Sequence, residues 1–505
     1  MARLSVFLFA ISILGAISGY ARELVLAITY GAGGVTDAYF VAANIPAVIT
    51  DLLIGSVLTA SVIPSLTRVM VGDIRKSLEI PALFSAFAIT VAVVTISLVL
   101  IVIANLSTIV NLLAEGLALE RKQLVTDLTY WLIWLLPLNA LLLLSSLSLN
   151  AAKVFIAPAF TSIIINFAFC IVLILGGGAS RNIIVAAIIG PVVMLAVNFL
   201  WLLKAGFIQM NKPSFGSSSF NLAIQLSKPV LLSVGIGSGL GLLMISHLIL
   251  RKYGSSLEGG SISALGYAFR IYEVPISLIT ATVGIQAMPL FSGFYNAQNY
   301  SKAAEIATEL FEGAFLVLVP IVVLVWMNSI QIVSLLFEYG RFNREAAELT
   351  ASALRGFSPA IFFEAVFMVA FRILYSLHRP GIAVLSGGLS LLLLNLLLST
   401  SYMSGSVSHL SSALSISFFI AAFSSIYGIG HALGRSVIPR LKFIVRGALA
   451  AVVASTVIFL WRSLFYDFNM ASWFIETSFF CAIYVLLVAI LIPEKIRKVK
   501  ELVSI

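Results

Sequence analysis

The sequence has few charged residues, few histidines and very few cysteines. Lys, Arg, Asp and Glu together make up only 10% of its 505 residues, and it contains two Cys and four His residues. Soluble domains are about one quarter charged, so this composition excludes an ordinary soluble protein. Cys170 and Cys481 stand singly in apolar segments, and the His residues are scattered. The sequence therefore predicts neither a disulfide framework nor a metal site, and no cofactor is expected.

Long apolar segments occupy most of the chain, of which 61% is hydrophobic. Apolar runs of about 20 residues, each long enough to cross a hydrocarbon core about 30 Å thick, recur from end to end. We therefore predict an all-α polytopic membrane protein, with about 14 transmembrane helices in two six-helix lobes plus a C-terminal helix pair. The net charge of +9 arises in loops between spans, so no nucleic acid is expected as a partner.

Breaks between the apolar runs predict the domain organisation. The longest polar stretch, residues 204–229, is rich in Ser, Gly and Pro, as linkers are. We predict an N-lobe with helices 1–6 (1–210), a cytoplasmic linker (211–227), a C-lobe with helices 7–12 (228–434), and helices 13–14 with a basic cytoplasmic tail (435–505). Weak similarities between the two halves indicate parallel repeats, which are typical of transporters.

The distribution of basic residues predicts the orientation of the chain. If the N-terminus is cytoplasmic, 18 Lys and Arg residues fall on the cytoplasmic side and 8 on the opposite side. Cytoplasmic loops of membrane proteins carry an excess of Lys and Arg. Both termini are therefore predicted to be cytoplasmic.

Several ionisable residues stand in or near the predicted spans, where charges are costly and usually functional. Those considered for substrate binding are Arg22, Glu23, Asp37, Asp51, Arg270 and Glu273. Three others are interpreted as structural: Arg355, Glu364 and Arg372. Arginine presents a planar fork of donors that suits phosphate oxygens. Two interpretations of Arg22 and Arg270 stay open, namely internal salt bridges and binding of an anionic substrate.

Three segments of the sequence resemble one family of transporters. They are "GYARELVLAITYGAGGVTDAYFVAANIP" (19–46), "YAFRIYEVPISLITATVGIQAMPLF" (267–291) and "IVSLLFEYGRFN" (332–343). The first is similar to the pattern G-(F/Y)-x-R-(D/E), followed by GAG-x-x-TDA-(F/Y)-FVA, of the MurJ (MviN) lipid II flippases in the MOP transporter superfamily. The resemblance covers nearly the whole chain, and the fourteen helices in two lobes with a C-terminal pair also fit it.

The resemblance implies a function in the bacterial plasma (inner) membrane. The protein would be a multi-pass flippase, not an enzyme, that moves an undecaprenyl-pyrophosphate-linked saccharide from the inner to the outer leaflet by alternating access. This substrate would be a lipid II-like precursor of peptidoglycan. Its partners would be that lipid-linked pyrophosphate saccharide and the membrane lipids, and we expect a monomer.

The resemblance also implies roles for individual residues. Arg22 and Arg270 would bind the diphosphate, and Glu23 and Glu273 would hold these arginines and compensate their charge. The expected substrate-binding set is completed by Asp37 and Asp51. The sodium site of some family members uses acidic residues on the seventh and eleventh helices. Neither helix has one in this sequence, so sodium coupling by that site is not expected.

The sequence departs from the family at positions where its members usually carry further arginines. These positions hold Ala16, Thr50 and Asp51. The departures leave open a flippase for another lipid-linked polysaccharide unit. A second alternative is a MATE-like small-molecule exporter of the same superfamily, which would favour cavity carboxylates such as Asp51. A third is a membrane-embedded transferase acting through the segment 337–348.

Overall fold

The described part of the protein is almost entirely helical. The structure, a computed structural model, describes residues 2–50, 58, 62–63, 66–67, 79–208, 239–400, 405–464 and 470–493. All regular structure in these residues is helical, which confirms the predicted all-α class. Eleven of the helices are long and apolar enough to cross a membrane, and two further apolar helices are shorter. The predicted number of fourteen is therefore not established by the described residues. Asp51 and the linker predicted at 211–227 lie outside them.

The chain forms two compact units, each built from more than one segment. Unit 1 comprises Met1–Tyr267 and Val333–Thr350, and unit 2 comprises Ala268–Ile332 and Ala351–Ile505. The division falls within three helices, which are α13 (Ser261–Asn296), α15 (Ser329–Phe337) and α16 (Arg344–Ser376). The four-part organisation expected from the sequence stays a prediction.

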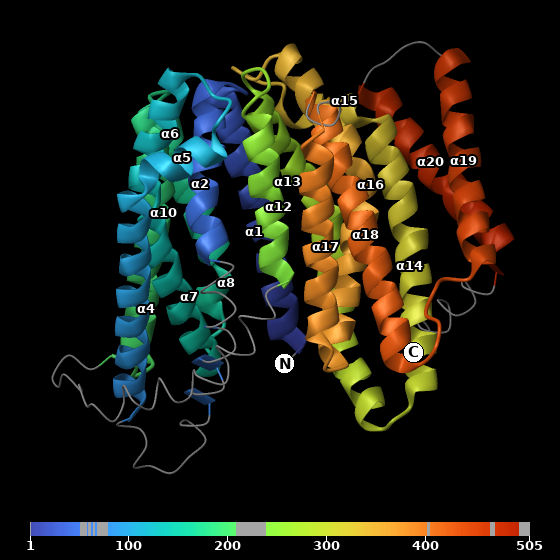
Figure 1. Cartoon of the computed structure of the whole chain (residues 1–505), viewed down its shortest axis with the longest axis horizontal. Coiled ribbons are helices and arrows are strands. Elements are labelled where there is room, and N and C mark those ends of the chain that lie inside the picture. The colour runs from blue at the N-terminus through green and yellow to red at the C-terminus, as the bar shows by residue number, and fades with distance from the viewer. Residues whose placement is uncertain are drawn as a thin grey trace. The chain divides into compact units, whose positions relative to one another are not determined.

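Unit 1 is a bundle of apolar helices. Those wholly within it are α1 (Ala2–Tyr30), α2 (Gly34–Ile49), α4 (Glu79–Ala104), α5 (Leu106–Leu113), α6 (Leu119–Leu132), α7 (Leu135–Ala151), α8 (Ile156–Ala159), α9 (Thr161–Gly176), α10 (Ser180–Lys204) and α12 (Gly239–Gly254). Helix α10 packs on α9 and α7, and α9 packs along α1. Helix α2 packs on α6 (Figure 1). Because lipid tails are as apolar as leucine, such helices associate through close packing and hydrogen bonds more than through removal from water.

Two glycines allow a loop after α15 to approach the end of α1 within unit 1. Gly31 and Gly340 have φ values of +67° and +60°, in the left-handed region that favours glycine. A Cβ at Gly31 would lie 2.6 Å from the carbonyl oxygen of Arg341, and one at Gly340 would lie 2.7 Å from that of Ile28. The backbone N–H of Arg341 donates to the Ile28 carbonyl at 3.0 Å. Two of the family-like motifs therefore meet through their backbones.

Unit 2 contains the remaining helices, including the C-terminal pair. They are α14 (Tyr300–Met327), α17 (Pro380–Leu398), α18 (Val407–Leu433), α19 (Leu441–Leu464) and α20 (Met470–Leu491). Helix α17 packs along α18, and α19 pairs with α20 (Figure 1). Arg462 of α19 lies 2.8 Å from Glu476 of α20, measured from Nε to Oε2, and both Arg462 and Trp473 donate to the side-chain oxygen of Asn328. Polar contacts therefore hold this pair together where a lone charge would be costly.

Candidate functional site

Arg22 lies in the last third of α1, and residues of α2 and α9 surround its guanidinium. Its Nη2 donates a hydrogen bond to the hydroxyl of Tyr39 at 2.9 Å. Its Cζ lies 4.7 Å from the centre of the Phe169 ring, within the range of a cation–π interaction. Its Nε lies 4.0 Å from Oε1 of Glu23. Three neighbours therefore hold the guanidinium in one position.

The two charged side chains of this cluster differ in exposure. The Arg22 side chain is 25% exposed, whereas the Glu23 side chain is only 5% exposed. Tyr39 and Phe169 are buried, with 2% of each residue exposed. The carboxylate is thus enclosed, while one quarter of the Arg22 side chain is exposed. This arrangement suits an anion-binding site in a membrane span, because the positive charge of an empty site needs a compensating charge.

Contacts between α1 and α9 place Phe169 beside Arg22. The Asn166 side-chain amide donates to the hydroxyl of Ser18 at 3.1 Å. A Cβ at Gly19 would lie 3.6 Å from that amide nitrogen, so small residues of α1 let the two helices come close. Because Phe169 stands one helical turn after Asn166, this hydrogen bond fixes the register that brings the ring to the guanidinium.

Arg270 and Glu273 lie on α13, in the part that belongs to unit 2. Nη1 of Arg270 lies 3.4 Å from Oε2 of Glu273, and this ion pair joins two residues that stand three apart on one face of the helix. The two side chains are 45% and 44% exposed. Both residues therefore combine mutual charge compensation with a larger exposed surface than Arg22 and Glu23 have.

Asp37 differs from these residues because its carboxylate accepts hydrogen bonds from backbone N–H groups. Its two oxygens accept hydrogen bonds from the N–H of Gly260 at 2.7 Å and from the N–H and hydroxyl of Ser263 at 2.8 and 2.6 Å. Asp37 is 1% exposed. Since α13 begins at Ser261, the carboxylate caps this helix from α2. The geometry favours a structural role for Asp37 over substrate contact.

The other ionisable residues of the spans in unit 2 bond to protein groups. Arg355 Nε donates to the Ser329 hydroxyl at 2.7 Å, Arg372 Nη1 donates to the Thr280 carbonyl at 2.6 Å, and the Tyr272 hydroxyl donates to Glu364 at 2.9 Å. The sequence did not identify these partners, because each lies on a different helix. It also missed Tyr39 and Phe169, although Tyr39 stands in the family-like motif. Within the described part of the chain, no group of three or more His, Cys, Asp or Glu side chains could hold a metal ion.

The sequence is similar to known flippases over most of its length. A family model described as "Lipid II flippase MurJ" matches residues 26–483. A probable lipid II flippase MurJ of Buchnera aphidicola subsp. Baizongia pistaciae is 24% identical over 359 residues, which cover 69% of this chain and 67% of that protein. A probable lipid II flippase MurJ of Rhizobium tropici is 25% identical over 357 residues, covering 67% and 64%. The matches thus span about two thirds of the length of these curated relatives.

Solved structures of two transporters share the fold. A lipid II flippase MurJ in an inward closed conformation superposes with a TM-score of 0.78 at 18% identity, covering 97% of this chain and 100% of that one. A multidrug resistance MATE transporter of the MOP superfamily in an inward-facing conformation gives a TM-score of 0.68 at 13% identity, covering 83% and 94%. At these identities the likeness concerns the fold. Because the family model matches well over half of its residues, this chain belongs to the MurJ family of lipid II flippases.

Proposed function

We propose that this chain is a flippase that moves an undecaprenyl-pyrophosphate-linked saccharide, such as a lipid II-like peptidoglycan precursor, from the inner to the outer leaflet by alternating access. The observation that supports this function is the geometry of Arg22. Its guanidinium contacts Tyr39, Phe169 and Glu23, and its side chain is one-quarter exposed. A planar guanidinium can bind phosphate oxygens through two parallel hydrogen bonds. Family membership supports the same class of substrate.

Each charged residue has a separate role in this proposal. Arg22 binds the diphosphate, and Glu23 compensates Arg22 when no substrate is bound, because a lone charge in a span costs about 2.5–3.5 kcal/mol. Arg270 is a second arginine that binds diphosphate, and it is compensated by Glu273. Asp51 stays a candidate on sequence grounds. Asp37 is assigned to capping α13, on the strength of its three hydrogen bonds.

The membrane potential can drive export of an anionic head group. Moving one elementary charge across 100 mV is worth about 2.3 kcal/mol, so a head group of charge about −2 gains roughly 4–5 kcal/mol. Binding and rocking of the lobes would then suffice for transport, without any covalent chemistry. In this proposal the protein acts as a monomer in the plasma membrane, with both termini in the cytoplasm, and is a transporter and not an enzyme.

The proposal is tested by replacing the arginines and following the lipid-linked precursor. Arg22→Ala and Arg270→Ala should reach normal protein levels in the membrane, yet the precursor should accumulate on the cytoplasmic leaflet. Arg22→Lys keeps the charge but loses the planar fork, so it should transport more slowly than the wild type. Tyr39→Phe removes one contact of the guanidinium and should reduce transport less than Arg22→Ala does. Lys302→Ala, which alters an exposed ion pair with Glu305, serves as the control.

The outcomes separate this function from its alternatives. Normal flipping by a well-expressed Arg22→Ala, Arg270→Ala double variant would refute the phosphate-binding role. If another lipid-linked saccharide accumulates when the protein is depleted, the protein serves a different polysaccharide. If depletion changes no lipid-linked intermediate but slows efflux of a cationic dye, the exporter alternative holds.

A further inference from the structure

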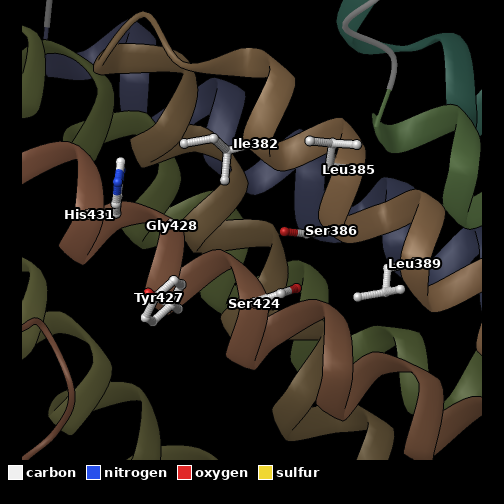
Figure 2. A pocket seen from close by; sticks show the side chains of 8 residues that line it. All are labelled: Ile382, Leu385, Ser386, Leu389, Ser424, Tyr427, Gly428 and His431. Carbon is white, nitrogen blue, oxygen red and sulfur yellow. The ribbon is translucent and has the colours of Figure 1, made fainter.

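A groove runs between α17 and α18 in unit 2. It has a volume of about 400 Å³, which lies in the range of ligand sites. Six of the residues that line it are Ile382, Leu385 and Leu389 from α17 and Tyr427, Gly428 and His431 from α18. Figure 2 shows Ile382 and His431 toward one end of the groove and Leu389 at the other.

The walls of the groove are apolar and accessible. Leu385 is 74% exposed and Tyr427 is 68% exposed. The hydroxyl of Ser424, which also lines the groove, donates to the carbonyl of Ile420 in its own helix at 2.7 Å. Both α17 and α18 are long and apolar enough to span a membrane. A hydrocarbon chain suits a groove with these walls.

Basic residues stand at one end of this groove. Arg379 is the N-cap of α17, one helical turn before Ile382. His431 lies in the last turn of α18, and Arg435 follows the glycine that ends this helix. Arg379, His431 and Arg435 are all exposed. The sequence from Pro380 to Leu433 contains no acidic residue, so no carboxylate of these two helices offsets the positive charge.

The length of the groove matches one leaflet. Ile382 and Leu389 are seven residues apart on α17, which corresponds to about 10 Å along the helix axis. Half of a hydrocarbon core about 30 Å thick is about 15 Å. The groove therefore fits within the leaflet at whose surface the basic residues stand. The excess of Lys and Arg in the predicted cytoplasmic loops assigns this to the inner leaflet.

We propose that this groove binds an anionic glycerophospholipid of the inner leaflet. One acyl chain lies between α17 and α18, and the phosphate contacts Arg379, His431 and Arg435. The complementary charge of the basic end selects an anionic head group, and the apolar walls select a lipid over a soluble anion. Neither Arg22 nor Arg270 lines the groove, so this proposal does not depend on the flippase proposal.

The test measures how many lipids the purified full-length protein retains. The protein is equilibrated with equal amounts of phosphatidylglycerol and phosphatidylcholine, and bound lipids are counted by native mass spectrometry. The wild type should retain phosphatidylglycerol preferentially. The Arg379→Gln, Arg435→Gln variant should lose about 25-fold in this preference, because each basic residue near a membrane contributes roughly fivefold to binding of anionic lipid. The Arg181→Gln, Lys302→Gln variant removes two exposed charges that lie outside the groove and should retain the preference.

A second pair of variants tests the acyl-chain position. Leu385→Trp places a bulky ring in the groove and should release the bound phosphatidylglycerol. Leu392→Trp is the matched control, because Leu392 is 72% exposed on the same helix but does not line the groove. Its lipid content should equal that of the wild type.

Three results would overturn the proposal. Equal retention of the two phospholipids, or an equal loss in the Arg181→Gln, Lys302→Gln control, would show that the basic end does not select the head group. The Arg379→Gln, Arg435→Gln variant could retain phosphatidylglycerol while Leu385→Trp loses it. This result would identify a groove that binds any hydrocarbon chain without selecting the head group. A change from dimer to monomer in Leu385→Trp, without a change in lipid content, would identify an interface between two copies of the protein.

Discussion

Ser263 donates two hydrogen bonds to one carboxylate oxygen of Asp37, from its backbone N–H at 2.8 Å and from its hydroxyl at 2.6 Å. The other oxygen accepts from the N–H of Gly260 at 2.7 Å. The first N–H groups of a helix have no partner within the helix, and a negative charge at this end is favoured by the helix dipole. Asp37 therefore joins α2 to the start of α13 within unit 1.

Asp37→Asn should destabilise the protein. The amide has one acceptor oxygen in place of two, and its NH2 group would face backbone donors. Hydrogen bonds to charged groups contribute about 1.5–3 kcal/mol, so we expect the free energy of unfolding to fall by about that amount in a denaturant titration in detergent micelles. Glu305→Gln, which alters an exposed ion pair with Lys302, is the control and should change it by less than about 1 kcal/mol. Unchanged stability with complete loss of transport would instead identify Asp37 as a substrate ligand.

Gly340→Ala should separate the loop after α15 from α1. The added Cβ meets the carbonyl of Ile28, and the left-handed backbone costs an alanine roughly 1–2 kcal/mol before any contact is counted. The thermal midpoint in detergent should therefore fall. Gly313→Ala is the matched control, because Gly313 lies inside α14 with no atom within 4 Å of an added Cβ. This helical substitution should leave the protein as stable or stabilise it by about 0.5–1 kcal/mol. Similar destabilisation by both changes would argue against the close backbone approach at Gly340.

The orientation can be tested by labelling single cysteines in a variant that lacks Cys170 and Cys481. Lys302→Cys should be shielded from an impermeant thiol reagent in intact cells, since Lys302 falls on the predicted cytoplasmic side. Glu348→Cys, near the start of α16, should be labelled. Both native side chains are exposed, at 51% and 63%, so access within the protein does not limit the reaction. Labelling of Lys302→Cys without permeabilisation would reverse the predicted topology.

The helical fold could be predicted from the sequence because each membrane-spanning helix is recognisable from its own length and apolar composition. An apolar run of the required length needs no knowledge of distant residues, and the helices described for the structure follow those runs. The Arg270–Glu273 ion pair was also predictable, because residues three apart share one face of a helix. Arg22 and Glu23 could be recognised as candidate functional residues because they interrupt an otherwise apolar segment.

The surroundings of these charges could not be predicted from local patterns. Phe169 stands far from Arg22 in the sequence, and only the packing of α9 on α1 brings its ring to the guanidinium. The partner of Asp37 at Gly260 is 223 residues away. Such contacts depend on how side chains of different helices interdigitate, and many helix pairs with similar apolar sequences could satisfy the same hydropathy pattern. Residues 333–350 belong to unit 1. The sequence did not predict this, because it also depends on packing between distant helices.

The hydroxyl of Tyr272 donates a hydrogen bond to the carboxyl group of Glu364. The hydroxyl lies 2.9 Å from Oε2 of Glu364, and these residues are 0% and 7% exposed. The Tyr272 ring also stacks on Phe357, with 4.9 Å between ring centres. None of the ion pairs among the described residues includes Glu364. An isolated carboxylate within a span is unfavourable, and its oxygen can accept the same hydrogen bond without a charge.

Glu364→Gln should therefore leave the free energy of unfolding within about 0.5 kcal/mol of the wild type or raise it, since glutamine keeps the shape and an acceptor oxygen. Tyr272→Phe keeps the ring stacking but deprives Glu364 of its donor, so it should lower that free energy by about 1–3 kcal/mol. The Tyr272→Phe, Glu364→Leu double variant should lose less than the sum of its single changes, because the two residues contact each other. Denaturant titrations of Glu364→Gln, Tyr272→Phe, Glu364→Leu and the double variant in the same micelles provide the measurement. If Glu364→Gln instead loses as much as Tyr272→Phe, the site requires an ionised carboxylate, and Glu364 becomes a candidate for binding a coupling cation.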